Sequence, residues 1–141
     1  MDAPDDSPDH GPDDQARALL HTAGLRATRG RLRVLGLLAH VDAPRSHADV
    51  VDALEGEGMD RTSVFRNLRD LAAAGLLHRF DPGDHVWRYE VRTTGHPHII
   101  CRDCGTIRCA AGVSVAIQGA DPALMARGLE VQLQGLCDDC A

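Results

Sequence analysis

The chain has no lysine and few aromatic residues: all 15 of its basic residues are Arg, and aromatic residues make up 3% of its 141 residues. A hydrophobic core must therefore come from Leu, Val, Ile and Ala. No apolar run approaches the length of a membrane span, so we expect no membrane partner. The first residues lack the basic and apolar stretches of a secretory signal, so we expect a cytoplasmic protein.

The net charge of −6 comes from one end of the chain. Residues 1–14 carry six of the 21 acidic residues and no basic residue, so the remainder is balanced. Between Gln15 and Phe80 there are ten Arg and seven acidic residues, and this local basic excess favours a polyanionic partner. Residues 1–14 contain few apolar side chains, and we expect them to form a disordered acidic tail.

Four segments with helical spacing of apolar residues follow the tail. The expected N-caps are Asp14, Thr28, Ser46 and Asp60, and Gly75 is expected to end the fourth helix. The residues expected to face the core are Ala16, Leu19, Leu20 and Ala23; Leu32, Leu35 and Ala39; Val50, Val51 and Leu54; and Val64, Leu68, Leu71 and Ala72.

The apolar period changes after the fourth segment. Residues 76–80 and 85–91 are predicted to be strands joined by the turn sequence DPGD. Helices followed by a β-hairpin indicate an α+β winged-helix fold, in which the third and fourth helices form a helix-turn-helix. A hinge is expected at 92–95, and from His96 onward we expect short strands, Gly turns and cysteines.

The fourth segment is the predicted DNA-reading helix, because the N-terminal residues of the second helix of a helix-turn-helix enter the major groove. Arg side chains bind guanine edges or phosphates, and the hydroxyls of Thr and Ser can also bind either a base edge or a phosphate. The alternative is that these Arg residues only solvate helix faces. The predicted DNA-binding residues are Arg61, Thr62, Ser63 and Arg66 on the reading helix, and Arg29 and Arg31 around the second helix.

Two CxxC motifs predict a structural metal site. Cys101 and Cys104 form one, and Cys137 and Cys140 form the other. Two such pairs close a tetrahedral thiolate cage with no open position, which is typical of structural zinc. Disulfides and a redox CxxC are the alternatives; the absence of an export signal disfavours the first, and the second needs only one pair.

A second candidate metal site combines Glu90, His96, His98 and Cys109. The two His alternate around Pro97, so on an extended chain they share one face. Cys109 is the cysteine that the four-thiolate cage leaves over. Two imidazoles, a carboxylate and a thiolate suit zinc and are borderline for iron or cobalt. Two surface His with no metal are the alternative.

Together these motifs resemble those of a known family. The run from His96 through Cys101 and Cys104 to Gly105 resembles the HxHxxCxxCG signature of ferric uptake regulator repressors. The segments 25–35 and 61–76 are similar to their N-terminal motif and recognition helix, and 135–140 to their closing knuckle. The match runs from about residue 15 to 140.

The resemblance implies a homodimer bound to a double-stranded DNA operator, with a winged-helix domain at 15–92 and a small α/β dimerisation domain at 93–141. It also implies a structural zinc and a second, regulatory divalent metal, Zn²⁺ or Fe²⁺/Mn²⁺. Matched by position, the four paired cysteines correspond to the structural cage and Glu90, His96 and His98 to regulatory ligands. Cys109 falls where the family often places a carboxylate.

The chain departs from the family pattern in four places. Phe65 stands where the recognition helix usually has Tyr, and Gly95-His96-Pro97-His98 replaces a common HHDH run. The stretch 128–137 is short and lacks the usual His. Pro44 occupies the place of a further regulatory His, for which His47 is a candidate substitute.

The sequence thus favours a metal-responsive repressor that is not an enzyme. The Cys109 thiolate favours zinc as the regulatory metal and the zinc-uptake branch of the family. Iron, manganese or peroxide sensing within the same family is the alternative, as is a zinc-stabilised protein-interaction module that binds no operator. An enzyme would need an open metal position and a pocket, and the sequence indicates neither.

Overall fold

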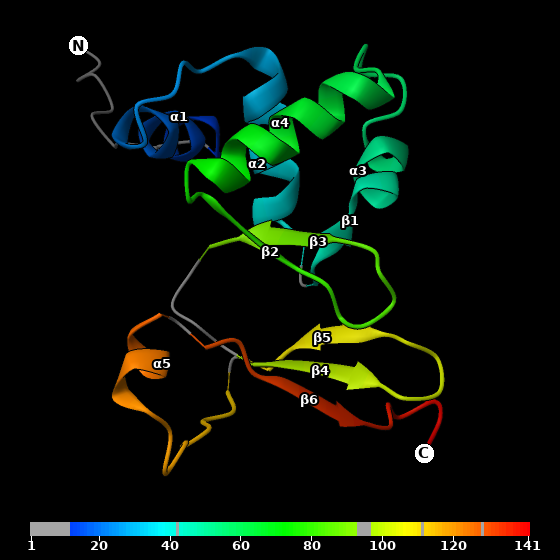
Figure 1. Ribbon diagram of the computed structural model, residues 1–141. Coiled ribbons are helices and arrows are strands. Elements are labelled where there is room, and N and C mark those ends of the chain that lie inside the picture. Colours follow the sequence, from blue (N-terminus) through cyan, green and yellow to red (C-terminus); the bar gives the residue numbers. More distant parts are fainter. Residues whose placement is uncertain (1–11, 42, 93–96, 111, 128) are drawn as a thin grey trace, which may run out of the picture.

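In a computed structural model of the chain, the four N-terminal helices lie at one end and a small sheet with one short helix lies at the other, with a second sheet between them (Figure 1). The structure describes residues 12–41, 43–92, 97–110, 112–127 and 129–141. We call the part from α1 to β3 the N-terminal lobe and the part from β4 to β6 the C-terminal lobe. Residues 12–14 of the predicted disordered tail belong instead to the first helix, and the rest of the tail and most of the predicted hinge lie outside the described residues.

The N-terminal lobe contains four helices and three strands. In chain order they are α1 (Pro12–Thr22), α2 (Arg29–Ala39), β1 (Arg45–Ser46), α3 (His47–Ala53), α4 (Arg61–Ala73), β2 (Leu77–Phe80) and β3 (Arg88–Val91). This is the predicted winged-helix order with one addition. The two-residue strand β1 pairs antiparallel with β3, and it is too short for an alternating pattern to reveal it in the sequence.

Three of the four predicted N-caps are confirmed. The side chains of Thr28, Ser46 and Asp60 accept hydrogen bonds from the backbone N–H groups three residues on, at 3.3, 3.1 and 2.7 Å. The prediction for Asp14 is wrong, because α1 begins at Pro12 and places Asp14 in its first turn. Proline is favoured at this first position, since its missing N–H would have no helical partner there.

The predicted helix faces form the main hydrophobic core. This core contains Ala16, Leu20, Val34, Leu35, Leu38, Val50, Leu54, Val64, Leu68, Leu71, Leu77 and Tyr89. Two expected members are exposed instead: Leu19, with 43% of its surface accessible, and Ala39. In α2 the buried stripe runs through Val34, Leu35 and Leu38, so the helix is rotated relative to the predicted stripe.

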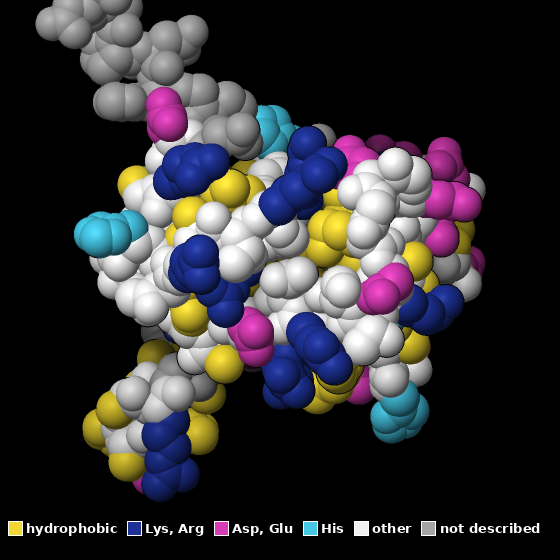
Figure 2. All heavy atoms as spheres, turned by 90° about the horizontal axis from the view of Figure 1, so that it is seen from above, with side chains coloured by type: hydrophobic (Ala, Val, Ile, Leu, Met, Phe, Trp, Pro, Cys, Tyr) yellow, Lys and Arg dark blue, Asp and Glu magenta, His cyan; other side chains and the backbone are white. Residues whose placement is uncertain are grey.

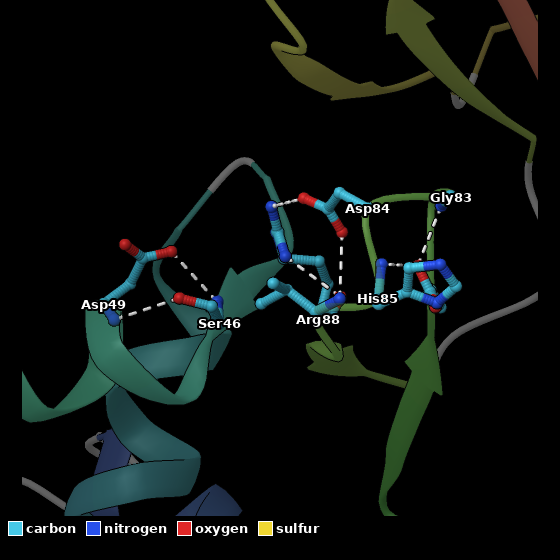
Figure 3. A network of polar contacts seen from close by, with 8 residues as sticks. Ser46, Asp49, Gly83, Asp84, His85 and Arg88 are labelled. Atoms are coloured by element: carbon cyan, nitrogen blue, oxygen red, sulfur yellow. Dashed lines mark hydrogen bonds and ion pairs between the residues drawn. The ribbon is translucent and has the colours of Figure 1, made fainter.

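The wing hairpin has a longer turn than its sequence predicted. The strand expected at 85–91 begins at Arg88, because carboxylates organise the preceding residues (Figure 3). Asp81 accepts hydrogen bonds from the N–H groups of Gly83 and His85, and His85 adopts a φ of 62°. Asp84 binds the guanidinium of Arg88 at 2.7 Å at the start of the strand.

The C-terminal lobe is a three-stranded sheet with one short helix. Its strands β4 (His98–Cys101), β5 (Ile107–Cys109) and β6 (Gln132–Gly135) have the order β5-β4-β6, with β4 and β6 parallel. The helix α5 (Pro122–Ala126) was not predicted, although its N-cap Asp121 followed by Pro122 is a helix-start signal.

The two sheets face each other, and the alternation of their side chains explains how. On β2 and β3, Leu77 and Tyr89 point into the helical core, whereas Phe80 and Glu90 lie on the opposite face. On β4, His98 and Ile100 are buried and Ile99 is exposed. Phe80, Ile100 and Ile107 form a second, small core between the sheets. Within the described residues, no helix is long and apolar enough to span a bilayer.

Candidate metal centres and nucleic-acid interface

The four paired cysteines lie together at one end of the C-terminal lobe. Their sulfur atoms lie within 4.8 Å of one another, and Cys104 Sγ is 3.7 Å from Cys137 Sγ. We call this group the cysteine cluster. Cys101 ends β4, and its parallel neighbour β6 leads into the second CxxC, so pairing of the two strands brings the motifs together.

Backbone groups of the turns already direct N–H donors at the sulfurs. The N–H groups of Cys104 and Cys137 lower the pKa of Cys101 to about 6. The Thr106 hydroxyl, 3.0 Å from Cys104 Sγ, lowers the pKa of Cys104. The neighbouring thiols, Cys137 first, raise the pKa of Cys140 to about 12. Such a crowded set holds several thiolates only if a cation shares them.

A second group of metal-binding side chains lies between the two sheets. Glu90 comes from β3, whereas His98 and Cys109 are cross-strand neighbours on β4 and β5. His98 Nε2 is 2.9 Å from Glu90 Oε1, and the Cys109 thiol donates to Glu90 Oε2 at 3.4 Å. Their ligand atoms lie within 4.8 Å of one another, and we call them the mixed cluster.

The donors of the mixed cluster suit a transition-metal ion. One imidazole, one carboxylate and one thiolate are all zinc ligands, and the first two also bind iron. Only 2% of the His98 side chain and 13% of the Glu90 side chain are exposed, so these two ligands are shielded from water. The fourth predicted ligand, His96, lies outside the described residues. Among the described residues, no group of three or more His, Cys, Asp or Glu beyond these two clusters converges in this way.

His47, the candidate substitute for a further regulatory His, points elsewhere. Its Nε2 lies 3.0 Å from the carbonyl oxygen of Arg61, and its ring packs edge-on against Phe65 at 5.7 Å. His47 is the first residue of α3, so it ties that helix to the start of α4. The structure therefore places His47 beside the predicted reading helix and not in the mixed cluster.

The predicted reading helix α4 presents its first turns to solvent. Arg61, Thr62, Phe65 and Arg66 are exposed, and Ser63 is half-buried beneath them. Figure 2 looks down on the helices of the N-terminal lobe, where Arg side chains are spread over the surface and acidic ones gather towards one edge. An exposed helix start with two Arg side chains on such a face has the chemistry of a phosphate and base contact surface.

The two predicted Arg residues on α2 differ in their surroundings. Arg29 is exposed. The guanidinium of Arg31 donates to the carbonyl oxygen of Arg26 at 2.8 Å and lies 3.8 Å from Asp70 on α4. Close by, a Cβ added to Gly30 would lie 2.7 Å from the Asn67 amide, so α2 and α4 are in close contact here. Arg31 thus links the two helices.

The sequence patterns did not point to two residues near the clusters. Thr106 lies beside a cluster sulfur, and Phe80 stacks on His98 with ring centroids 4.3 Å apart. Leu77 and Phe80 are three residues apart on β2, so they point to opposite faces of the strand. Since both are apolar, the sequence did signal that β2 is covered on both faces. Nothing in the sequence indicated which partner covers the second face.

Comparison with known proteins agrees with the fold and the motifs. The sequence model of the ferric uptake regulator family matches residues 22–117. The chain is 37% identical over 130 residues to the transcriptional regulator FurA of Mycobacterium tuberculosis, covering 86% of this chain and 87% of that one. It is 31% identical over 131 residues to the zinc uptake regulation protein of the same species, covering 86% and 98%.

The solved structures show the same fold. The ferric uptake regulator of Vibrio cholerae superposes with a TM-score of 0.65 at 22% identity, covering 86% of this chain and 98% of that one. By name both sequence relatives are regulators, in agreement with the prediction that this chain is a regulator. Family match, relatives and fold agree, and the chain belongs to the ferric uptake regulator family of metal-responsive transcriptional regulators.

Proposed function

We propose that the chain is a repressor that binds operator DNA when a divalent metal occupies the mixed cluster. The observation that carries the proposal is the origin of the ligands: Glu90 belongs to the wing sheet, and His98 and Cys109 to the facing sheet. An ion bound to all three joins the two lobes, and His96 is the proposed fourth ligand. Joining fixes the orientation of the reading helix, so the metal shifts the protein towards the form that fits DNA.

Zinc is the proposed regulatory metal. The Cys109 thiolate, held 3.4 Å from Glu90, adds a soft donor to the set. Soft sulfur ligands favour zinc over manganese, and zinc accepts the mixture of sulfur, nitrogen and oxygen donors without a strong geometric preference. For the cysteine cluster we propose a permanently bound structural zinc.

DNA contact is proposed for the exposed start of α4. Arg61 and Arg66 bind guanine edges or phosphates, and the hydroxyls of Thr62 and Ser63 bind the sugar-phosphate backbone of the DNA. Arg29 is a phosphate ligand at the start of α2. Arg31 instead positions α4, because its guanidinium already contacts the carbonyl oxygen of Arg26 and the carboxylate of Asp70.

The proposed division is a DNA-binding domain at 15–92 and a dimerisation domain at 93–141. A homodimer places two reading helices in successive major grooves, about 34 Å apart. Exposed apolar side chains in the C-terminal lobe support a protein contact there, among them Val113, Val115 and Leu129. Sedimentation of the zinc-loaded protein tests the dimer.

The function can be tested by selecting the operator from random DNA. Random double-stranded DNA is selected on the zinc-loaded protein, and the affinity of the selected fragment is measured with Zn²⁺, Fe²⁺, Mn²⁺ or a mild chelator. We expect the tightest binding with Zn²⁺, a steep salt dependence, and a weaker salt dependence in Arg61→Ala and Arg66→Ala. Equal affinity with and without chelator would refute the proposal.

Iron or manganese sensing is the second candidate, because Glu90 and His98 also suit these ions and one close relative is named FurA. Tighter DNA binding with Fe²⁺ or Mn²⁺ than with Zn²⁺ would favour it. If the selection is repeated with Fe²⁺ and Mn²⁺ and no DNA is selected with any of the three metals, the remaining interpretation is a zinc-stabilised interaction module.

A further inference from the structure

Phe80 belongs to the N-terminal lobe by chain position and to the C-terminal lobe by packing. It ends strand β2 and pairs with Arg88 of β3. Only 2% of its surface is exposed, and its buried partners are Ile100 and Ile107 on the facing sheet. The wing thus supplies the largest side chain of the small core between the sheets.

The geometry of β2 explains this position. Leu77 at the start of the strand is buried in the helical core, and Phe80, three residues on, points to the opposite face. Glu90 on the neighbouring strand β3 lies on the same face as Phe80 and reaches His98. Movement of the wing hairpin away from the second sheet would therefore withdraw Phe80 and Glu90 together.

Phe80 also fixes the plane of a candidate metal ligand. Its ring stacks on the His98 imidazole, with centroids 4.3 Å apart and planes inclined by 19°. Glu90 fixes the direction of the same ring through the 2.9 Å contact to Nε2. A metal ion binds an imidazole nitrogen in the plane of the ring, so the stack decides where an ion on His98 can lie.

We propose that Phe80 is the positioning residue that couples a divalent cation in the mixed cluster to docking of the wing on the C-terminal lobe. The inference rests on the proposed function and adds the residue through which it operates. With the wing docked, Phe80 and Glu90 together orient His98 for the cation. With the wing undocked, His98 loses the contacts to Phe80 and Glu90, together with the stacked ring of His78 on the same strand as Phe80, and affinity for the cation falls.

The test compares Phe80→Leu, which removes the aromatic plane but keeps an apolar side chain, with Ile107→Val, which loosens the same core without touching the stack. The cysteine cluster is first filled with zinc, and Co²⁺ is then titrated into the mixed cluster. The visible spectrum of Co²⁺ reports the ligand geometry. Affinity for the selected DNA fragment is measured with and without Co²⁺.

We expect Phe80→Leu to weaken Co²⁺ binding by at least about 10-fold, to alter the Co²⁺ spectrum and to reduce the metal-induced gain in DNA affinity to a similar degree. Ile107→Val should keep the wild-type Co²⁺ spectrum and the wild-type metal-induced gain in DNA affinity. A wild-type spectrum and Co²⁺ affinity in Phe80→Leu would overturn the inference. If Phe80→Leu does not fold, Phe80→Met, which fills the site with a flexible side chain, is read in the same way.

The two ideas fail separately in this design. If the DNA affinity of the wild-type protein is the same with and without the metal, the proposed function is refuted. The Co²⁺ affinity and spectrum require no DNA, so they still decide whether Phe80 positions His98.

Discussion

The two lobes are stabilised by different means. The N-terminal lobe has an extended apolar core to which all four of its helices and its sheet contribute. Among its described residues, the C-terminal lobe contributes Ile100 and Ile107 to a small core that Phe80 from the wing completes. The same lobe holds the cysteine cluster, whose four thiols could bind a metal. Small lobes with too little core are commonly stabilised by a metal.

The two clusters differ in whether their ligands come from one lobe or from both. All four residues of the cysteine cluster belong to the C-terminal lobe, so a metal there stabilises that lobe alone. The mixed cluster draws on both lobes, so a metal there acts on their relative position. Ligands taken from one lobe suit a permanent ion, and ligands shared between lobes suit a regulatory one.

The largest effect is expected from Cys137→Ser, because removal of one thiolate opens the proposed structural cage. Zinc binding of this type contributes on the order of 10 kcal/mol to folding of small metal-dependent domains. We expect the amides of β4 and β6 to lose protection in hydrogen exchange while those of α2 and α4 keep it. Cys109→Ser is the matched control and should leave both sets protected.

Leu68→Ala should produce the opposite pattern. Leu68 is fully buried in the helical core, and deletion of such a side chain costs about 2–5 kcal/mol. Urea unfolding should show this loss in the helices, while one tightly bound zinc per chain remains by elemental analysis. Loss of that zinc on Leu68→Ala would show that the lobes do not fold independently.

An intermediate effect is expected from Cys109→Ser in the mixed cluster. Exchange of the thiolate for a hydroxyl removes the soft donor, so affinity for the second Zn²⁺ should fall roughly 10- to 100-fold while the first zinc stays bound. Competition with a zinc chelator of known affinity measures both constants. An unchanged dissociation constant for the second Zn²⁺ would show that Cys109 is not a ligand.

The smallest effect belongs to the cap of α3. The Ser46 hydroxyl accepts from the Asp49 N–H at 3.1 Å, and the Ser46 N–H donates to the Asp49 carboxylate at 2.9 Å, a reciprocal pair seen in Figure 3. Ser46→Ala should lower the free energy of unfolding by about 1 kcal/mol. Ser46→Thr, which keeps the hydroxyl, should recover most of that loss in the same urea titration.

Sequence patterns predicted the parts of the molecule that depend on local chemistry. Thr28, Ser46 and Asp60 cap helices because their side chains bond backbone groups three residues away, and CxxC spacing brings sulfurs together within a turn. The rotation of α2 and the strand β1 escaped prediction because tertiary packing decides them, whereas the start of α1 at Pro12 is a local proline signal that was overlooked. The stacking of the two sheets, which brings Phe80 onto His98, depends on contacts between segments far apart in the sequence.

The central claim is that one metal ion joins the lobes in the form that binds DNA. Thermodynamic linkage makes this claim measurable, because the factor by which the metal tightens DNA binding must equal the factor by which DNA tightens metal binding. The most direct measurement is therefore a titration of the second metal ion with and without the selected DNA fragment, in wild-type protein and in Glu90→Gln. The account predicts tighter metal binding in the presence of DNA for the wild type, and none of this gain in Glu90→Gln, whose ligand from the wing sheet is impaired. Metal affinity in the wild type that is unchanged by DNA would contradict it.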